Sequence, residues 1–144
     1  MITKKKKKLS RKQELKKFDR KRSELVKVRA WFKCEVDWCW KTNNLNSHHI
    51  FTRNNYSTRF DLDNWICLCT WHHTFSNHFS AHRTPMEFSQ RIIKKRWKKR
   101  YEWLKYKANQ IRDKDYDRIK FYLEQKEQEL CTKSISRNES KSNT

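Results

Sequence analysis

The sequence predicts a small α+β domain in which a two-stranded core is flanked by basic helices. Three observations support this fold class. First, two short β-prone runs occupy residues 45–51 and 65–69. Second, the stretches on either side of these runs place apolar residues at helical spacing, with lysine and arginine between them. Third, pairs of cysteine and histidine residues bracket the two runs. A chain of 144 residues has room for one such domain and its tails.

Composition divides the chain into five predicted segments. These are a disordered basic tail over 1–9, a basic helix over 10–33, the core over 34–84, basic helices over 85–131 and a disordered tail over 132–144. The first tail contains the lysine run Lys4–Lys8, whose charges repel one another. Ser10 and Gln13 have the spacing of a capping box, which places the start of the first helix.

The overall charge points to a polyanionic partner. Lysine and arginine number 36 against 16 acidic residues, a formal net charge of +20 that favours nucleic acid. No apolar run approaches the roughly 20 residues of a membrane span, so we expect no membrane partner. The N-terminus lacks the apolar core of a secretory signal. Five cysteines mixed with histidines indicate metal ligands in a reducing compartment, which predicts a cytoplasmic location.

The cysteine and histidine pairs predict a structural zinc site. Cys34 and Cys39 have the spacing of a zinc knuckle, and Cys69 and His72 form a second pair downstream. Together they give a Cys3His set. Cys67 is an alternative ligand, because in a strand it points to the same side as Cys69. His72 is preferred because a two-residue gap suits a turn or the first turn of a helix.

The core is expected to contain two strands followed by helices. The strand over 45–51 carries His48 and His49, whose side chains should point to opposite faces unless the strand bends. A polar loop then leads to Asn64 and the second strand, and a helix is expected from Thr70 onward. The next helix should begin at Thr84-Pro85, where Thr84 and Glu87 have capping-box spacing and proline occupies the first helical position.

The stretch from Cys34 to Phe88, little more than a third of the chain, resembles the HNH (ββα-metal) endonuclease family. The resemblance rests on the cysteine pair, the strand with His48-His49, Asn64, and then Cys69-x-x-His72-His73, in that order and with similar gaps. It implies a zinc-bound ββα-metal core. The segment from Arg59 to Asn64 is also similar to phage NinG-like recombination nucleases.

The resemblance implies a catalytic role for each matching residue. His49 matches the general base that activates a water, and His48 matches the preceding ligand of a catalytic metal. Asn64 matches the asparagine that ties the loop and orients the base. His73 matches the metal ligand on the helix. His72 stands where the family usually has a cysteine, which is a departure from its pattern.

The resemblance leaves the last ligand of the catalytic metal open. Asn77 has helical spacing from His73, whereas His78 is the better ligand type, and His82 is the next candidate. The family implies Mg2+ or Mn2+ as the catalytic ion. Such an ion can offset phosphate charge and stabilise the leaving oxygen, and a neutral imidazole can take a proton from water.

The predicted function is a metal-dependent DNA endonuclease that hydrolyses phosphodiester bonds with a histidine base, in phage recombination, repair or packaging. The alternative is a non-catalytic zinc-finger protein that binds DNA. Further histidines are surplus to a four-ligand zinc site, which favours the enzyme; among them are His48, His49, His73 and His78.

The expected partner is duplex or branched DNA, bound by a monomer or a homodimer. Arg53 and Arg59 can grip phosphates bidentately, although each can equally form a salt bridge within the loop. A basic helical face should add phosphate contacts through Lys94, Lys95, Lys98 and Lys99. If the chain is phage-encoded, its site of action is the host cytoplasm.

Overall fold

Helix α1 (Arg11–Arg29) opens the fold, and the predicted capping box begins it. Ser10 N donates to Gln13 Oε1 at 2.8 Å, and Gln13 N donates back to Ser10 Oγ at 3.4 Å. The structure is a computed structural model that describes residues 9–110 and 114–142, with the backbone alone for 94–96 and 138–142. The lysine run Lys4–Lys8 lies outside the described residues.

The end of α1 turns sharply without glycine, which this chain lacks altogether. Trp31 and Phe32 have φ values of 54° and 52°, in the left-handed region that bulky residues seldom occupy. Phe32 N donates to Lys27 O at 2.9 Å, the long hydrogen bond of a Schellman-type helix end. The turn directs the chain toward Cys34.

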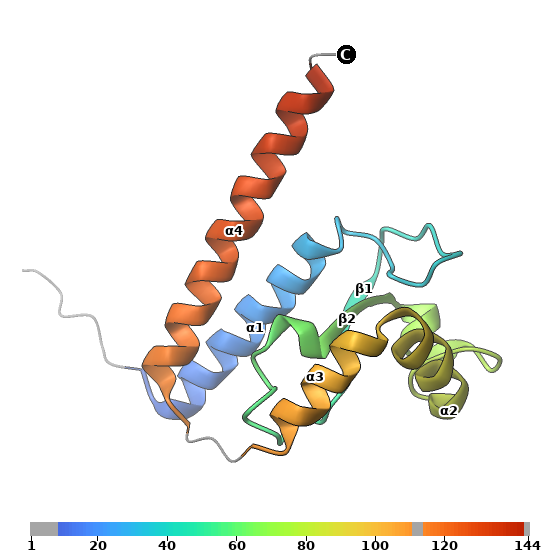
Figure 1. The fold of residues 1–144 in the computed structure, drawn as a ribbon, viewed down its shortest axis with the longest axis horizontal. Coiled ribbons are helices and arrows are strands. Elements are labelled where there is room, and N and C mark those ends of the chain that lie inside the picture. The colour runs from blue at the N-terminus through green and yellow to red at the C-terminus, as the bar shows by residue number, and fades with distance from the viewer. Residues whose placement is uncertain (1–8, 111–113, 143–144) are drawn as a thin grey trace, which may run out of the picture.

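The two predicted strands form an antiparallel pair, β1 (Leu45–His49) and β2 (Trp65–Cys69), with Leu45 opposite Cys69 and His49 opposite Trp65. Every residue of β2 is buried, because both of its faces are covered. Ile66 and Leu68 pack toward Phe88. The other face is covered by α1 and α4 through residues that include Leu25, Val26 and Leu123. The fold is therefore mixed α+β, as predicted, with the sheet between helices (Figure 1).

The connection between the strands ends in a short helical turn, η1 (Leu62–Asn64), which two arginines secure. Arg29 donates to Leu62 O at 2.6 Å and to Trp65 O at 2.8 Å. Arg100 donates to the same two oxygens, at 3.1 Å each. A carbonyl oxygen can accept two hydrogen bonds, so the two guanidinium groups satisfy these acceptors together. They hold the entry to β2 from both sides.

The region after β2 corrects the predicted helices. A single π-helical turn, η2 (Trp71–Phe75), replaces the expected longer helix, and an irregular loop follows it. Thr84 does not cap the next helix, because its Oγ1 instead accepts from Ser80 N at 2.7 Å. Proline does occupy the first turn, as predicted.

The basic helix predicted from residue 85 is divided into three elements, α2 (Pro85–Phe88), η3 (Ser89–Arg96) and α3 (Lys98–Ala108). Trp97 breaks the helix, with φ −121° and ψ 35°. Arg100 stacks on the Trp97 ring at 4.6 Å and reaches the carbonyls before β2. Tertiary contacts thus override a continuous helical pattern.

Helix α4 (Tyr116–Ser142) corrects the predicted disordered tail, because residues 132–142 continue it. The segment has no glycine or proline to end a helix. It runs beside α1 in the same direction (Figure 1), with Tyr116 near Phe18 and Arg137 over the Trp31 ring at 4.7 Å. Within residues 9–110 and 114–142, none of the helices has the length and apolar character that crossing a bilayer requires.

Candidate metal centres

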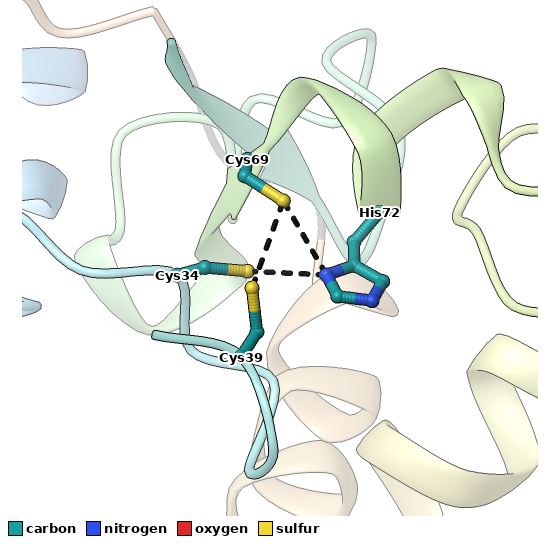
Figure 2. Close-up of side chains that lie close together, drawn as sticks. All are labelled: Cys34, Cys39, Cys69 and His72. Carbon is teal, nitrogen blue, oxygen red and sulfur yellow. Dashed lines mark hydrogen bonds between the residues drawn. The ribbon is translucent and has the colours of Figure 1, made fainter. Parts of the chain in front are cut away.

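Four side chains from three segments converge beside the sheet (Figure 2). Cys34 and Cys39 come from the turn after α1, Cys69 ends β2, and His72 lies on η2. Their ligand atoms all lie within 4.8 Å of one another. Cys34, Cys69 and His72 are buried and Cys39 is half-buried, so this cysteine–histidine tetrad is largely shielded from solvent. The four residues can hold a metal ion.

The distances within the tetrad fit a tetrahedral site. Cys39 Sγ lies 3.8 Å from Cys69 Sγ, and His72 Nδ1 lies 3.5 Å from Cys34 Sγ and 3.4 Å from Cys69 Sγ. Zn–S bonds of about 2.3 Å and a Zn–N bond of about 2.0–2.1 Å place tetrahedral ligands about 3.8 Å apart for two sulfurs and about 3.5 Å for sulfur and nitrogen. A disulfide needs sulfurs about 2.05 Å apart, so these cysteines are not bridged. The donor set fits zinc.

Burial disfavours a bare thiolate in the tetrad. Desolvation, with a smaller contribution from the neighbouring thiols of Cys69 and Cys39, raises the pKa of the Cys34 thiol to about 12. A bound metal ion would supply positive charge and hold the thiolate form. Burial also lowers the pKa of His72, which keeps its imidazole neutral and able to act as a ligand.

Cys67, the alternative ligand, is not part of the tetrad. It is buried among Leu25, Val26 and Trp65 on the α1 side of β2, whereas Cys69 joins the cluster on the other side. In a regular strand the side chains of Cys67 and Cys69 would point to the same face. They do not, because the strand ends at Cys69 and the chain turns into η2 at Thr70. Cys67 is a core thiol.

A second group of three imidazoles, the triple-histidine cluster, lies beside β1 on the side of the sheet that faces Phe88. His48 belongs to β1, His73 to η2 and His82 to the loop that follows η2. Their ligand nitrogens lie within 4.8 Å of one another, and His73 Nε2 is 3.3 Å from His82 Nε2. Two nitrogens bound to one metal at about 2.1 Å lie about 3.0–3.4 Å apart. This spacing therefore suits a shared cation.

The environment of the triple-histidine cluster favours neutral imidazoles. Desolvation, together with the neighbouring imidazoles of His49, His73 and His82, lowers the pKa of His48 to about 3. Burial also lowers the pKa of His73, and its Nδ1 lies 3.0 Å from Thr74 Oγ1. A partner on Nδ1 fixes the orientation of the ring and leaves Nε2 free to bind a metal.

A folded-back loop delivers His82 to this cluster. Ala81 N donates to His72 O at 2.9 Å, and His82 N donates to His73 O at 3.2 Å. Ser76 Oγ accepts from Phe79 N at 3.1 Å and turns the chain. The loop thus returns to η2 and sets His82 beside His73.

Both of the leading candidates for the last ligand lie elsewhere on this loop. Asn77 and His78 were expected on a helix that continued past His73, but η2 ends at Phe75 and both residues are exposed on the loop. Asn77 Oδ1 accepts from Arg83 Nη1 instead of facing the cluster. His82, the third candidate, occupies the position. The one feature of the sequence that pointed to His82 was that it is a further histidine close to His73.

His49 lies beside the triple-histidine cluster. Its ring stacks on that of His48, with centroids 5.1 Å apart and planes at 18°, and packs edge-on against Trp65 at 5.6 Å. The two rings are neighbours because the strand ends at His49 and the chain bends at Ile50. Burial first, and the charges of Arg53 and Arg22 among other causes, lower the pKa of His49, so its neutral form is favoured.

Asn64 is fully buried and ties down the chain that follows His49. Its Oδ1 accepts from Phe51 N at 2.7 Å, and its Nδ2 donates to Phe51 O at 3.0 Å. Its own carbonyl accepts from Ile50 N at 2.8 Å. Three hydrogen bonds therefore fix the two residues after His49.

The predicted DNA contacts differ in their surroundings. Arg53 is exposed, and its charge influences the pKa of His49. Arg59 forms an ion pair with Asp19 at 2.6 Å and is largely covered, which is the salt bridge considered as the alternative. Lys98 and Lys99 are exposed at the start of α3. The side chains of Lys94 and Lys95 lie outside the described part of the structure.

No protein-family model matches the chain, and comparison with curated proteins and with solved structures gives no significant match.

Proposed function

We propose that this chain is a metal-dependent DNA endonuclease with an HNH-type ββα-metal centre. One observation carries the proposal. A buried cysteine–histidine tetrad is complete without His48, His73 and His82, and these three form a second cluster with His49 stacked beside it. A DNA-binding zinc finger needs only four ligands and has no use for the second cluster.

The tetrad has the features of a structural zinc site. Its four ligands leave no open position, and they join the turn after α1 to the end of β2 and to η2. Zinc there contributes folding energy directly. Thiolate ligands need a reducing compartment, which supports a cytoplasmic location.

The triple-histidine cluster has the features of a catalytic site. Three protein nitrogens leave coordination positions open for phosphate and water. A bound cation would offset charge on the phosphate and stabilise the leaving oxygen. Imidazole donors favour a first-row transition ion over Mg2+, which prefers oxygen ligands. Of the two ions that the resemblance implies, this donor set therefore favours Mn2+ over Mg2+.

His49 would take the proton from the attacking water. A neutral imidazole is suited to this step at physiological pH. Asn64 forms hydrogen bonds with both backbone groups of Phe51. These bonds restrain the chain after His49 and help to hold the His49 ring against that of His48. Pre-organisation of this kind removes part of the entropy cost of reaching the transition state.

The charge of the chain supports a nucleic-acid substrate. The net charge of +20 attracts phosphate, and Arg53 lies close enough to His49 to influence its pKa. Exposed Lys98 and Lys99 add basic surface on α3. A role in phage recombination, repair or packaging rests on the resemblance alone.

A cleavage assay tests the function. The zinc-loaded protein is incubated with supercoiled, linear, single-stranded and branched DNA, with Mn2+, Ni2+, Zn2+ or Mg2+ in turn, or with no added ion. We expect cutting that depends on the added ion and is strongest with a transition ion. If the protein binds these DNAs but cuts none of them with any ion, it is a zinc-dependent binding module instead.

A further inference from the structure

Large aromatic side chains are exposed on the segments that the tetrad joins. Trp40 is 80% exposed, Trp71 51%, Trp38 45% and Phe75 53%. Trp38 and Trp40 flank Cys39, while Trp71 and Phe75 lie on η2 with His72. Aromatic side chains that stay in contact with solvent are available to stack on a ligand. We call these four residues the aromatic platform.

The tetrad fixes the two halves of the aromatic platform relative to each other. Cys39 Sγ lies 3.8 Å from Cys69 Sγ, which brings the turn with Trp40 next to the segment that enters η2. Thr70 N also donates to Asn44 O at 3.0 Å. A surface held in this way loses little conformational freedom when it binds a ligand.

Cations lie over two of the rings. Lys41 Nζ is 5.9 Å from the centre of the Trp71 ring, and Arg91 Cζ is 4.1 Å from that of Trp38. Lys41 and Arg91 are both exposed, so they can also meet phosphate. Aromatic faces interleaved with cations are what single-stranded nucleic acids require, because bases stack on the rings while the cations follow the backbone. The cations therefore favour nucleic acid over an uncharged protein surface as the partner, because an uncharged surface would form no ion pairs with them.

One half of the aromatic platform shares a helical turn with a ligand of the proposed catalytic centre. Trp71 and Phe75 share η2 with His73, whose imidazole belongs to the triple-histidine cluster. We propose that the aromatic platform stacks unpaired bases of single-stranded DNA, with Lys41 and Arg91 on its phosphates. This inference rests on the proposed nuclease function and deepens it: the substrate is DNA that contains an unpaired segment.

Binding without cleavage tests the inference independently. A fluorescent oligothymidylate and a duplex of the same length are titrated with full-length, zinc-loaded protein, with no added divalent ion, and anisotropy is read. Stacking of one base changes affinity by roughly tenfold. We expect Trp40→Ala and Trp71→Ala each to weaken single-strand binding by roughly tenfold and to leave duplex binding within about twofold.

Trp103→Ala is the matched control, because Trp103 is an equally exposed tryptophan on α3, away from the tetrad. It should bind both DNAs like the wild type. Zinc content is measured in each variant, and Trp40→Ala, which removes a side chain that is 80% exposed, decides the result if Trp71→Ala loses zinc.

Two results would overturn the inference. One is unchanged single-strand affinity in Trp40→Ala; the other is an equal loss on single strand and duplex. Loss of self-association in Trp40→Ala, seen by sedimentation with single-strand binding intact, would assign the aromatic platform to a second copy of the chain. A protein that binds single strands through the aromatic platform but never cuts DNA would keep the inference about binding and refute the proposed function.

Discussion

His72 and His73 are consecutive residues whose imidazoles enter two different clusters. His72 Nδ1 lies 3.4 Å from Cys69 Sγ, whereas His73 Nε2 lies 3.3 Å from His82 Nε2. The π-helical turn of η2 presents both rings, a geometry often found at functional sites. Any change that unwinds η2 should therefore disturb both metal centres at once.

The tetrad should hold one zinc ion per chain. In the double variant Cys34→Ser/Cys69→Ser, we expect zinc to fall to background and the melting temperature to drop sharply, because metal binding here contributes folding energy. Elemental analysis and thermal unfolding measure the two effects. Cys131→Ser is the control, because Cys131 is exposed on α4. This variant should keep its full zinc content. Full zinc content in the double variant would refute the assignment.

His82 should bind the second cation, and His78 should not. Both are exposed histidines of the same loop, which makes His78→Ala a matched control. Removing one of three ligands should weaken the binding of Mn2+ or Ni2+ to the zinc-loaded protein on the order of tenfold or more, since changes outside the ligand shell already cost about 10- to 100-fold. Isothermal titration measures the affinity. Equal affinities in His82→Ala and wild type would remove His82 from the site.

His49→Ala should abolish most cleavage without affecting the fold. Loss of a general base typically costs about 100- to 10,000-fold in rate. Zinc content, DNA affinity and affinity for the second cation should stay near wild type, because His49 belongs to neither group of candidate ligands. Single-turnover cleavage gives the rate, and added imidazole should restore part of it. Cutting at the wild-type rate would remove His49 from the mechanism.

Asn64→Ala should reduce both stability and rate. It leaves Phe51 N and O without their partner, and an unsatisfied buried group costs about 1–3 kcal/mol. Chemical denaturation measures the free energy of unfolding, and the cleavage assay measures the rate. Asn54→Ala, at an exposed position of the same loop, should change neither quantity. A fully stable and fully active Asn64→Ala would show that this tie is dispensable.

Exposed Lys98 and Lys99 should contribute to DNA affinity without reading sequence. In Lys98→Ala/Lys99→Ala, we expect weaker duplex binding on every sequence and a salt dependence whose slope falls by about 1–2, because each phosphate contact releases counterions. Fluorescence anisotropy over a range of salt concentrations measures the slope. Unchanged slope and affinity would place the duplex elsewhere on the protein.

The parts of this fold that the sequence predicts are those set by local pattern. The two strands, the capping box at Ser10 and the two ligand pairs, Cys34 with Cys39 and Cys69 with His72, all depend on short spacings, and all are present. Whether the tetrad and the triple-histidine cluster bind their ions stays a prediction.

The parts that the sequence does not predict depend on distant contacts. His82 reaches its place because backbone hydrogen bonds return the loop to η2, which no local pattern encodes. The break at Trp97 coincides with the reach of Arg100 toward Leu62 and Trp65. The far part of α4 packs against the end of α1, with Arg137 over the ring of Trp31.

The two arginines that share the carbonyls of Leu62 and Trp65 set an order of events during translation. Arg29 leaves the ribosome before these residues and Arg100 after them, since the chain emerges from its N-terminus. Until α3 has emerged, the turn that carries Asn64 is held from one side alone. The entry to β2 therefore gains its second set of hydrogen bonds only after all three residues of the triple-histidine cluster have left the ribosome.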